Sequence, residues 1–225
     1  ANLTSAEVAS ALNLTSGIDL TSYNPFAAGV NADTALAVEI AAQQVSAVIR
    51  GISSAMTEAG VSSADAAELA SNAVAEALAD ANTVDLTDSS LIASAITNAT
   101  SGLSSSQASA VSQVASAVAT ATANLNEVIA QSTSISSSDQ FALIDDLLAQ
   151  ITAAVENDGD TSLIEFTDPQ AVEDAVSGSG GSGEEEQNND PTGSVTISGE
   201  AVQGQTLTAV IDTLADTDGL GTFSY

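Results

Sequence analysis

The sequence predicts a mainly α-helical protein: an alanine-rich antiparallel helical bundle, followed by a flexible linker and a truncated β segment. Three changes in composition along the 225 residues lead to this prediction. In residues 1–176, Val, Leu and Ile recur every three or four positions, as they do on one face of a helix. Residues 177–193 contain only polar residues, Gly and Pro, which is typical of a flexible acidic Gly/Ser linker. Residues 194–225 alternate apolar and polar residues with the period of a strand.

The first segment is predicted to be a short helix followed by a long connection. Ser5 is a candidate N-cap for a helix over about 6–12. Residues 13–33 contain glycines and a proline, and we expect an ordered loop that carries Tyr23 and Phe26.

Further helices are predicted from capping residues and breaks. They are expected over about 34–59, 63–81, 89–100, 105–131, 138–156 and 168–176. Gly60 should stop the first of these, and Ser62, together with Asp65, should begin the next. Asp88 is a candidate N-cap, and so is Asp168, which precedes a proline suited to a first helical turn.

Three of these helices show apolar stripes that predict their buried faces. The expected stripes are Val38, Val45, Ile49, Ile52 and Met56; then Val111, Val114, Val118, Ala121, Leu125 and Val128; then Phe141, Ile144, Leu148, Ile151 and Val155. Such narrow stripes suit bundle packing, and short connections favour antiparallel neighbours. Ala and Ser at contact positions should allow the helices to approach closely.

The charge balance excludes most catalytic mechanisms. The chain has 30 acidic residues and one basic residue, Arg50, for a net charge of −29, and it lacks Lys, His, Cys and Trp. Histidine bases, cysteine nucleophiles, disulfides and zinc clusters are therefore excluded. A carboxylate pair, as in glycoside hydrolysis, remains conceivable, but the six aromatic residues are scattered. We expect a protein that is not an enzyme.

The same charge balance bears on partners. A polyanion repels phosphate backbones and anionic lipids, so we expect no binding to nucleic acid. Residues 89–126 carry no charge, but polar residues interrupt them every two or three positions, so no membrane insertion is expected. The chain begins at Ala1 without a signal-peptide pattern, and we interpret it as a piece of something longer. The thinly spread acidic residues indicate a solvated surface suited to high ionic strength; the alternative is that divalent cations neutralise particular clusters.

One acidic turn has part of the spacing of a calcium loop. If Gly159 takes the sixth place of an EF-hand-type loop, Asp158 takes the fifth and Glu165 the twelfth. The first place would be Ala154, which offers no side-chain oxygen. The alternative interpretation is a turn at the end of a helix. The candidate calcium ligands are Glu156, Asp158, Asp160 and Glu165.

A second candidate calcium site lies in the β segment. Asp216 and Asp218 precede Gly219 there, and the alternative interpretation is a polar turn between strands. Calcium is the only cofactor that the sequence suggests.

The C-terminal segment resembles the opening of a bacterial immunoglobulin-like repeat. The resemblance rests on GSVTISG (193–199), GQTLTA (204–209) and LADTDGLGTFSY (214–225), about the last 33 residues. Such repeats occur in tandem in very large secreted or surface-attached proteins, often exported by type I secretion.

The residues fit such a domain only in part. Strands are expected around Val195 and Ile197, then from Leu207 to Ile211, with a third beginning at 222–225. An immunoglobulin-type sandwich needs about seven strands. We therefore expect 194–225 to be poorly ordered alone or completed by another chain.

Together these observations predict a non-enzymatic spacer module of a large extracellular or cell-surface adhesin-like bacterial protein. Its partners would be neighbouring repeats of the parent protein or other copies of itself. The first alternative is a self-assembling filament or surface-layer subunit that uses the open β segment for strand addition. A second alternative is an accessory helical domain of an enzyme.

Overall fold

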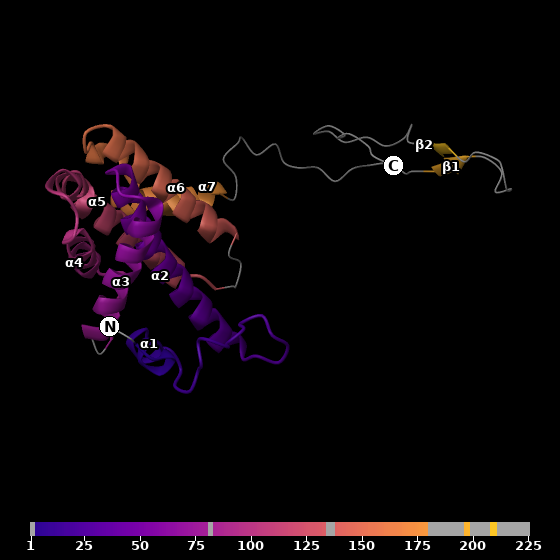
Figure 1. Cartoon of the computed structure of the whole chain (residues 1–225). Coiled ribbons are helices and arrows are strands. Elements are labelled where there is room, and N and C mark those ends of the chain that lie inside the picture. Colours follow the sequence, from indigo (N-terminus) through magenta and orange to yellow (C-terminus); the bar gives the residue numbers. More distant parts are fainter. Residues whose placement is uncertain (1–2, 81–82, 134–137, 180–195, 199–207, 211–225) are drawn as a thin grey trace. The chain divides into compact units, whose positions relative to one another are not determined.

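The protein is mainly α-helical, as the sequence predicts. The computed structural model describes residues 3–80, 83–133, 138–179, 196–198 and 208–210 (Figure 1). The chain divides into two units, Ala1–Gly180 and Gly181–Tyr225. In the described part of the first unit, the α-helices are α1 (Ser5–Ala11), α2 (Ala32–Glu58), α3 (Ser63–Asp80), α4 (Ser89–Thr100), α5 (Ser105–Ala130), α6 (Ser138–Glu156) and α7 (Pro169–Ser179).

The helix starts agree with the predicted caps, with one correction. The Asp88 side chain accepts a hydrogen bond from the Ser90 amide at 2.8 Å, and the Ser62 hydroxyl accepts one from the Asp65 amide at 3.2 Å. The cap of α1, however, is Thr4 rather than Ser5. Thr4 forms a reciprocal capping box with Glu7, which satisfies two backbone amides at the helix start.

The end of α2 confirms the predicted stop at Gly60. This residue has a φ of 88°, in the left-handed region that glycine adopts without a steric penalty. The Gly60 amide donates to the Thr57 carbonyl, and the Val61 amide donates to the Met56 carbonyl at 3.0 Å. These two bonds satisfy carbonyls that the last turn of a helix leaves free.

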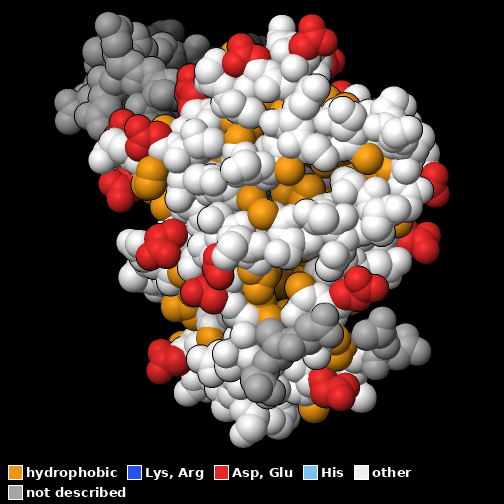
Figure 2. All heavy atoms as spheres, turned by 90° about the vertical axis from the view of Figure 1, so that its left-hand side faces the viewer, with side chains coloured by type: hydrophobic (Ala, Val, Ile, Leu, Met, Phe, Trp, Pro, Cys, Tyr) orange, Lys and Arg blue, Asp and Glu red, His pale blue; other side chains and the backbone are white. Residues whose placement is uncertain are grey.

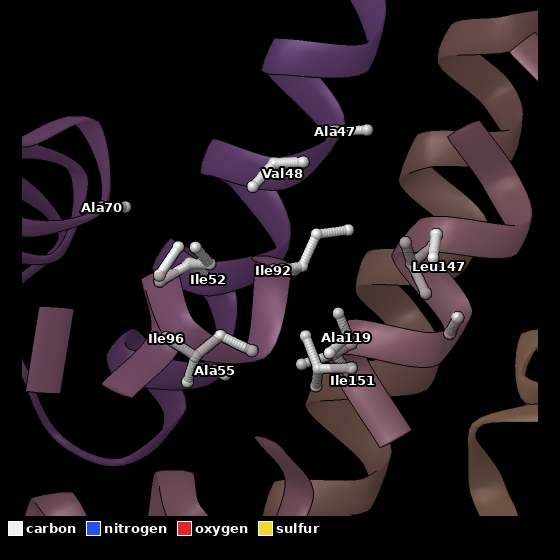
Figure 3. Packing of buried hydrophobic residues seen from close by; sticks show 14 of the residues in the cluster. Ala47, Val48, Ile52, Ala55, Ala70, Ile92, Ile96, Ala119, Leu147 and Ile151 are labelled. Atoms are coloured by element: carbon white, nitrogen blue, oxygen red, sulfur yellow. The ribbon is translucent and has the colours of Figure 1, made fainter. Parts of the chain in front are cut away.

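The core forms around α2, which contacts α3, α5 and α6 (Figure 1). Figure 3 shows side chains from α2, α4, α5 and α6 directed into one apolar interior. Its largest fully buried members are Phe166, Ile52, Met56, Ile92, Ile96, Leu125, Ile129, Ile144, Leu147, Ile151, Ile164 and Val48. The stripe predicted for α5 is confirmed, because all of its residues up to Leu125 are fully buried and Val128 is partly buried.

Small residues bring α2 and α5 close together, as the alanine-rich composition predicts. Ala47, Gly51 and Ala55 are buried on α2. A methyl group added at Gly51 would lie 3.1 Å from Oγ1 of Thr122 on α5 and 3.8 Å from Cδ1 of Ile151 on α6. The prediction placed Val45 and Ile49 at the centre of this face, but both are only partly buried.

The stripe predicted for α6 is wrong in part. Phe141 is 43% exposed, and Leu148 and Val155 are only partly buried. Leu143 and Leu147 are buried instead, together with the correctly predicted Ile144 and Ile151. The helix contains two overlapping apolar stripes, and its neighbours α2, α5 and α7 determine which one faces inward.

Two short 3₁₀ helices that the sequence analysis missed join α6 to α7: η1 (Thr161–Leu163) and η2 (Glu165–Thr167). They bury Ile164 and Phe166 against the core. Asp168 accepts a hydrogen bond from the Gln170 amide at 3.0 Å, so the predicted N-cap is confirmed. The last helix ends at Ser179, three residues into the predicted linker, and the remainder of that linker lies outside the described residues.

In the second unit, β1 (Thr196–Ser198) and β2 (Thr208–Val210) pair antiparallel, with Ile197 opposite Ala209. These strands lie within the two strand regions that the sequence predicts. The expected third strand, and the other residues on which the immunoglobulin-like resemblance depends, lie outside the described residues. The resemblance stays a prediction.

Candidate functional site

The predicted calcium turn is a helix C-terminus that packs against α5. Asp158 and Gly159 have positive φ values of 55° and 82°, and the Gly159 amide donates to the Ala154 carbonyl at 2.9 Å. A methyl group added at Gly159 would lie 2.7 Å from Oε1 of Gln113 on α5. The glycine is therefore explained by its backbone conformation and by this close contact.

Among the four candidate ligands of this turn, Asp160 has a structural task of its own. Asp160 caps η1 by accepting hydrogen bonds from the Ser162 hydroxyl at 2.7 Å and the Ser162 amide at 3.1 Å. These bonds stabilise the carboxylate and lower the pKa of Asp160. Glu165 opens η2, beyond η1, and Glu156 is the last residue of α6. Within the described ranges, no three acidic side chains are grouped so that they could hold a metal ion.

The second candidate site, Asp216 and Asp218, lies outside the described residues. Calcium binding by either site stays a prediction from sequence.

A surface hollow lies where α2 ends and α3 and α5 begin. It has a volume of about 490 Å³. The Gln107 side-chain amide crosses it and donates to the Gly60 carbonyl at 2.9 Å. Asp65 accepts a hydrogen bond from the Ser62 hydroxyl at 2.7 Å, and Glu68 also lines the hollow. Because Asp65 and Gln107 are engaged in capping, they hold the helix ends in place and are poorly suited to acid–base chemistry.

A smaller hollow of about 300 Å³ contains Arg50, the only basic residue of the chain. The Arg50 guanidinium pairs with Asp145 on α6 at 2.5 Å, and the side chains are 39% and 66% exposed. An exposed pair of this kind contributes roughly 0–1 kcal/mol to stability. It is the single ion pair among the residues that the structure describes, so the remaining negative charge is balanced only by solvent ions.

Two asparagines on α5 form polar contacts inside the first unit that the sequence analysis missed. Asn126 is fully buried. Its side-chain amide donates to the Leu86 carbonyl at 2.8 Å, and its backbone carbonyl accepts a hydrogen bond from the Gln44 side-chain amide at 3.0 Å. Asn124 donates to the Phe166 carbonyl at 2.9 Å. These bonds fasten the α3–α4 connection and η2 to α5, which is a structural task.

The acidic surface is dispersed. Figure 2 shows single carboxylates separated by uncharged side chains, with small apolar areas between them. On the face shown, no cluster of carboxylates concentrates the electrostatic field where it could orient a charged substrate.

One helix meets the length and composition criterion for a membrane span. In the part of the chain that the structure describes, this is α2, with 27 residues, a mean hydropathy of 1.3 in its best window and 39% of that window buried inside the unit. Core helices of soluble proteins meet the same criterion, so membrane insertion is not decided by it.

No protein family, curated protein or solved structure matches this chain in sequence or in fold.

Proposed function

We propose that the chain is a non-enzymatic structural module, an antiparallel helical bundle that serves as a spacer in a large extracellular or cell-surface adhesin-like bacterial protein. The observation that carries the proposal is the separation between apolar side chains, which fill the core, and carboxylates, which cap helices or lie exposed. The largest fully buried side chains are all apolar, and the carboxylates of the acidic turn serve as caps or lie exposed on the surface. A rigid body with a solvated surface suits a spacer, which must hold its shape and avoid aggregation.

The composition supports the proposed extracellular location. A chain without cysteine has no thiol to oxidise outside the cell, and thinly spread acidic residues tolerate high ionic strength because screening shortens their repulsion. The resemblance of the C-terminal segment to a bacterial immunoglobulin-like repeat supports the same location. Protease treatment of intact cells that produce the parent protein should release peptides of residues 1–180; if peptides appear only after lysis, the proposed location is wrong.

The second candidate function is a self-assembling filament or surface-layer subunit. The observation that favours it is the β1–β2 pair: among the described residues these strands pair only with each other, and a short sheet of this kind can add a strand from another chain.

Sedimentation velocity of the full chain, with and without calcium, separates the two functions. A spacer should remain monomeric at every protein concentration, and a filament subunit should form long polymers. Replacing Ile197 in β1 with proline removes a backbone donor and should abolish strand addition, whereas Gln187→Pro in the predicted linker should not. If the chain forms long polymers, and if Ile197→Pro abolishes them while Gln187→Pro does not, the spacer function is refuted and the filament function is supported.

A further inference from the structure

The connection between α1 and α2 is unusually long for a compact helical unit. Residues 12–31 contain turns but no helix or strand. Loops longer than about 12–15 residues without secondary structure are uncommon, and they are often functional. Figure 1 shows this loop extending away from the bundle beyond the start of α2.

Hydrogen bonds within and beside the loop give it a defined shape. The Leu20 amide donates to the Ser5 hydroxyl at 2.7 Å, which ties the loop to the start of α1. The Tyr23 amide donates to the Asp19 carbonyl at 2.9 Å. Near the tip, the Phe26 amide donates to the Asn24 side-chain oxygen at 2.9 Å. These bonds hold the backbone on either side of Phe26, which reduces the backbone entropy that binding would remove.

The tip of the loop is apolar and faces solvent. It consists of residues 23–28 (YNPFAA), which carry no charge, and its polar side-chain groups are the Asn24 amide and the buried Tyr23 hydroxyl. The Phe26 side chain is 66% exposed, the largest exposed fraction among the large apolar side chains of the described residues. Since the loop is held by its own polar contacts, core packing does not explain an aromatic ring at this position. Aromatic side chains held by rigid loops are frequent anchors of protein interfaces.

The charges around the tip indicate the chemistry of its partner. The first 49 residues contain four acidic residues and no basic one. Asp19 in the loop and Asp33 in the first turn of α2 are exposed. The only basic residue, Arg50, is paired with Asp145. A second copy of this chain therefore cannot supply a basic surface around the ring, whereas a different protein can.

We propose that the loop tip, residues 23–28, is a docking element whose Phe26 ring enters an apolar pocket with a basic rim on a different protein. This adds a binding surface to the proposed spacer role and does not depend on it. The ring supplies the buried apolar contact, and the exposed carboxylates of Asp19 in the loop and Asp33 at the start of α2 favour a basic partner.

The probe is a fluorescently labelled amphipathic helical peptide of leucine and lysine, which offers an apolar face with basic flanks. Its binding to the full chain is measured by anisotropy in about 0.3 M NaCl, where repulsion and attraction between distant charges are screened. Phe26→Ser should weaken binding at least about tenfold, the usual effect of removing an aromatic anchor. The matched control, Phe141→Ser, removes another exposed ring on α6 and should change binding less than about twofold.

Three results would overturn the proposal. The first is an equal effect, or none, of the two serine variants. The second is equal binding of a leucine–glutamate peptide, which would show that the partner does not need a basic rim. The third is self-association of the wild-type chain that Phe26→Ser abolishes, since the occupant would then be a second copy. Circular dichroism melts of both variants check that the fold is intact, which we expect because both rings are exposed.

Discussion

The contact between α2 and α5 at Gly51 offers a direct test of the packing. In Gly51→Ala, the new methyl group would lie 3.1 Å from the Thr122 hydroxyl oxygen, closer than ordinary van der Waals contact. Its next neighbours, in Ile151 and Val118, lie at 3.8 and 3.9 Å, which is ordinary contact. Thr122 is therefore the only side chain among these that resists the substitution.

Two opposing terms determine the change in unfolding free energy. Alanine favours a helix interior over glycine by about 1 kcal/mol. Crowding in a packed core costs roughly 1–3 kcal/mol for each overpacked site. We expect the lower part of that range, because the Thr122 hydroxyl has no hydrogen-bond partner to lose when it shifts. The substitution should therefore be neutral or destabilising by up to about 1 kcal/mol in the wild-type background.

Urea unfolding of a double-mutant cycle isolates the contact. In the Thr122→Ala background the close oxygen is gone, and Gly51→Ala should stabilise by about 1 kcal/mol. The coupling energy between the two positions should therefore be about 1–2 kcal/mol, within the range known for contacting residues. The cost of truncating Thr122 occurs in both arms and cancels. If Gly51→Ala stabilises equally in both backgrounds, α2 and α5 do not meet at this position.

Three further predictions concern the core, the loop and the surface. Ala121 is fully buried, so Ala121→Leu should cost roughly 1–3 kcal/mol in thermal melts, and an unchanged melt would contradict its inward orientation. Hydrogen bonds from Thr21 and Ser22 lower the pKa of Asp19 from 3.8 to about 2, so Asp19 should stabilise the folded loop above pH 3.8 and lose this effect as the pH falls toward 2. Thr21→Ala should raise the carboxyl pKa toward 3.8 in an NMR titration, and an unmoved pKa would exclude that bond. Because the described residues contain a single ion pair, the melting temperature should rise from low salt to about 1 M NaCl, and a falling one would show that repulsion does not limit stability.

The helix boundaries could be predicted because short polar side chains mark them. Asp88, Asp168 and the Ser62–Asp65 pair satisfy backbone amides within their own turn, so their effect depends on local sequence alone. The cap of α1 was misplaced by one residue, although the spacing of Thr4 and Glu7 carries the signal of a capping box. Ser5 instead holds a loop residue fifteen positions away, which no local pattern reveals.

The face that a helix buries was harder to predict when the sequence offers two. On α5 the predicted residues from Val111 to Leu125 are all buried, but Val128 is only partly buried and the neighbouring Ile129 is fully buried in its place. On α6, Phe141 and Leu148 form one possible stripe with Ile144, and Leu143 and Leu147 form another. Periodicity supports both equally. The choice depends on neighbouring helices, and this is why an aromatic residue predicted for the core lies 43% exposed.

The acidic turn after α6 shows why a spacing pattern alone is weak evidence for a metal site. A calcium loop and a helix C-terminus both require a residue with positive φ, and Gly159 satisfies either requirement. The two differ in the partners that their carboxylates contact: a shared ion in a calcium loop, and nearby amides and hydroxyls at a helix C-terminus. Asp160 is occupied by hydrogen bonds to Ser162, two residues further along, and the Asp-x-Ser spacing already favours that local bond over a shared ion. Of the four candidate ligands, Asp160 has such partners, and no three acidic side chains of the described residues are grouped to hold a metal ion, so calcium binding at this turn stays a prediction from sequence.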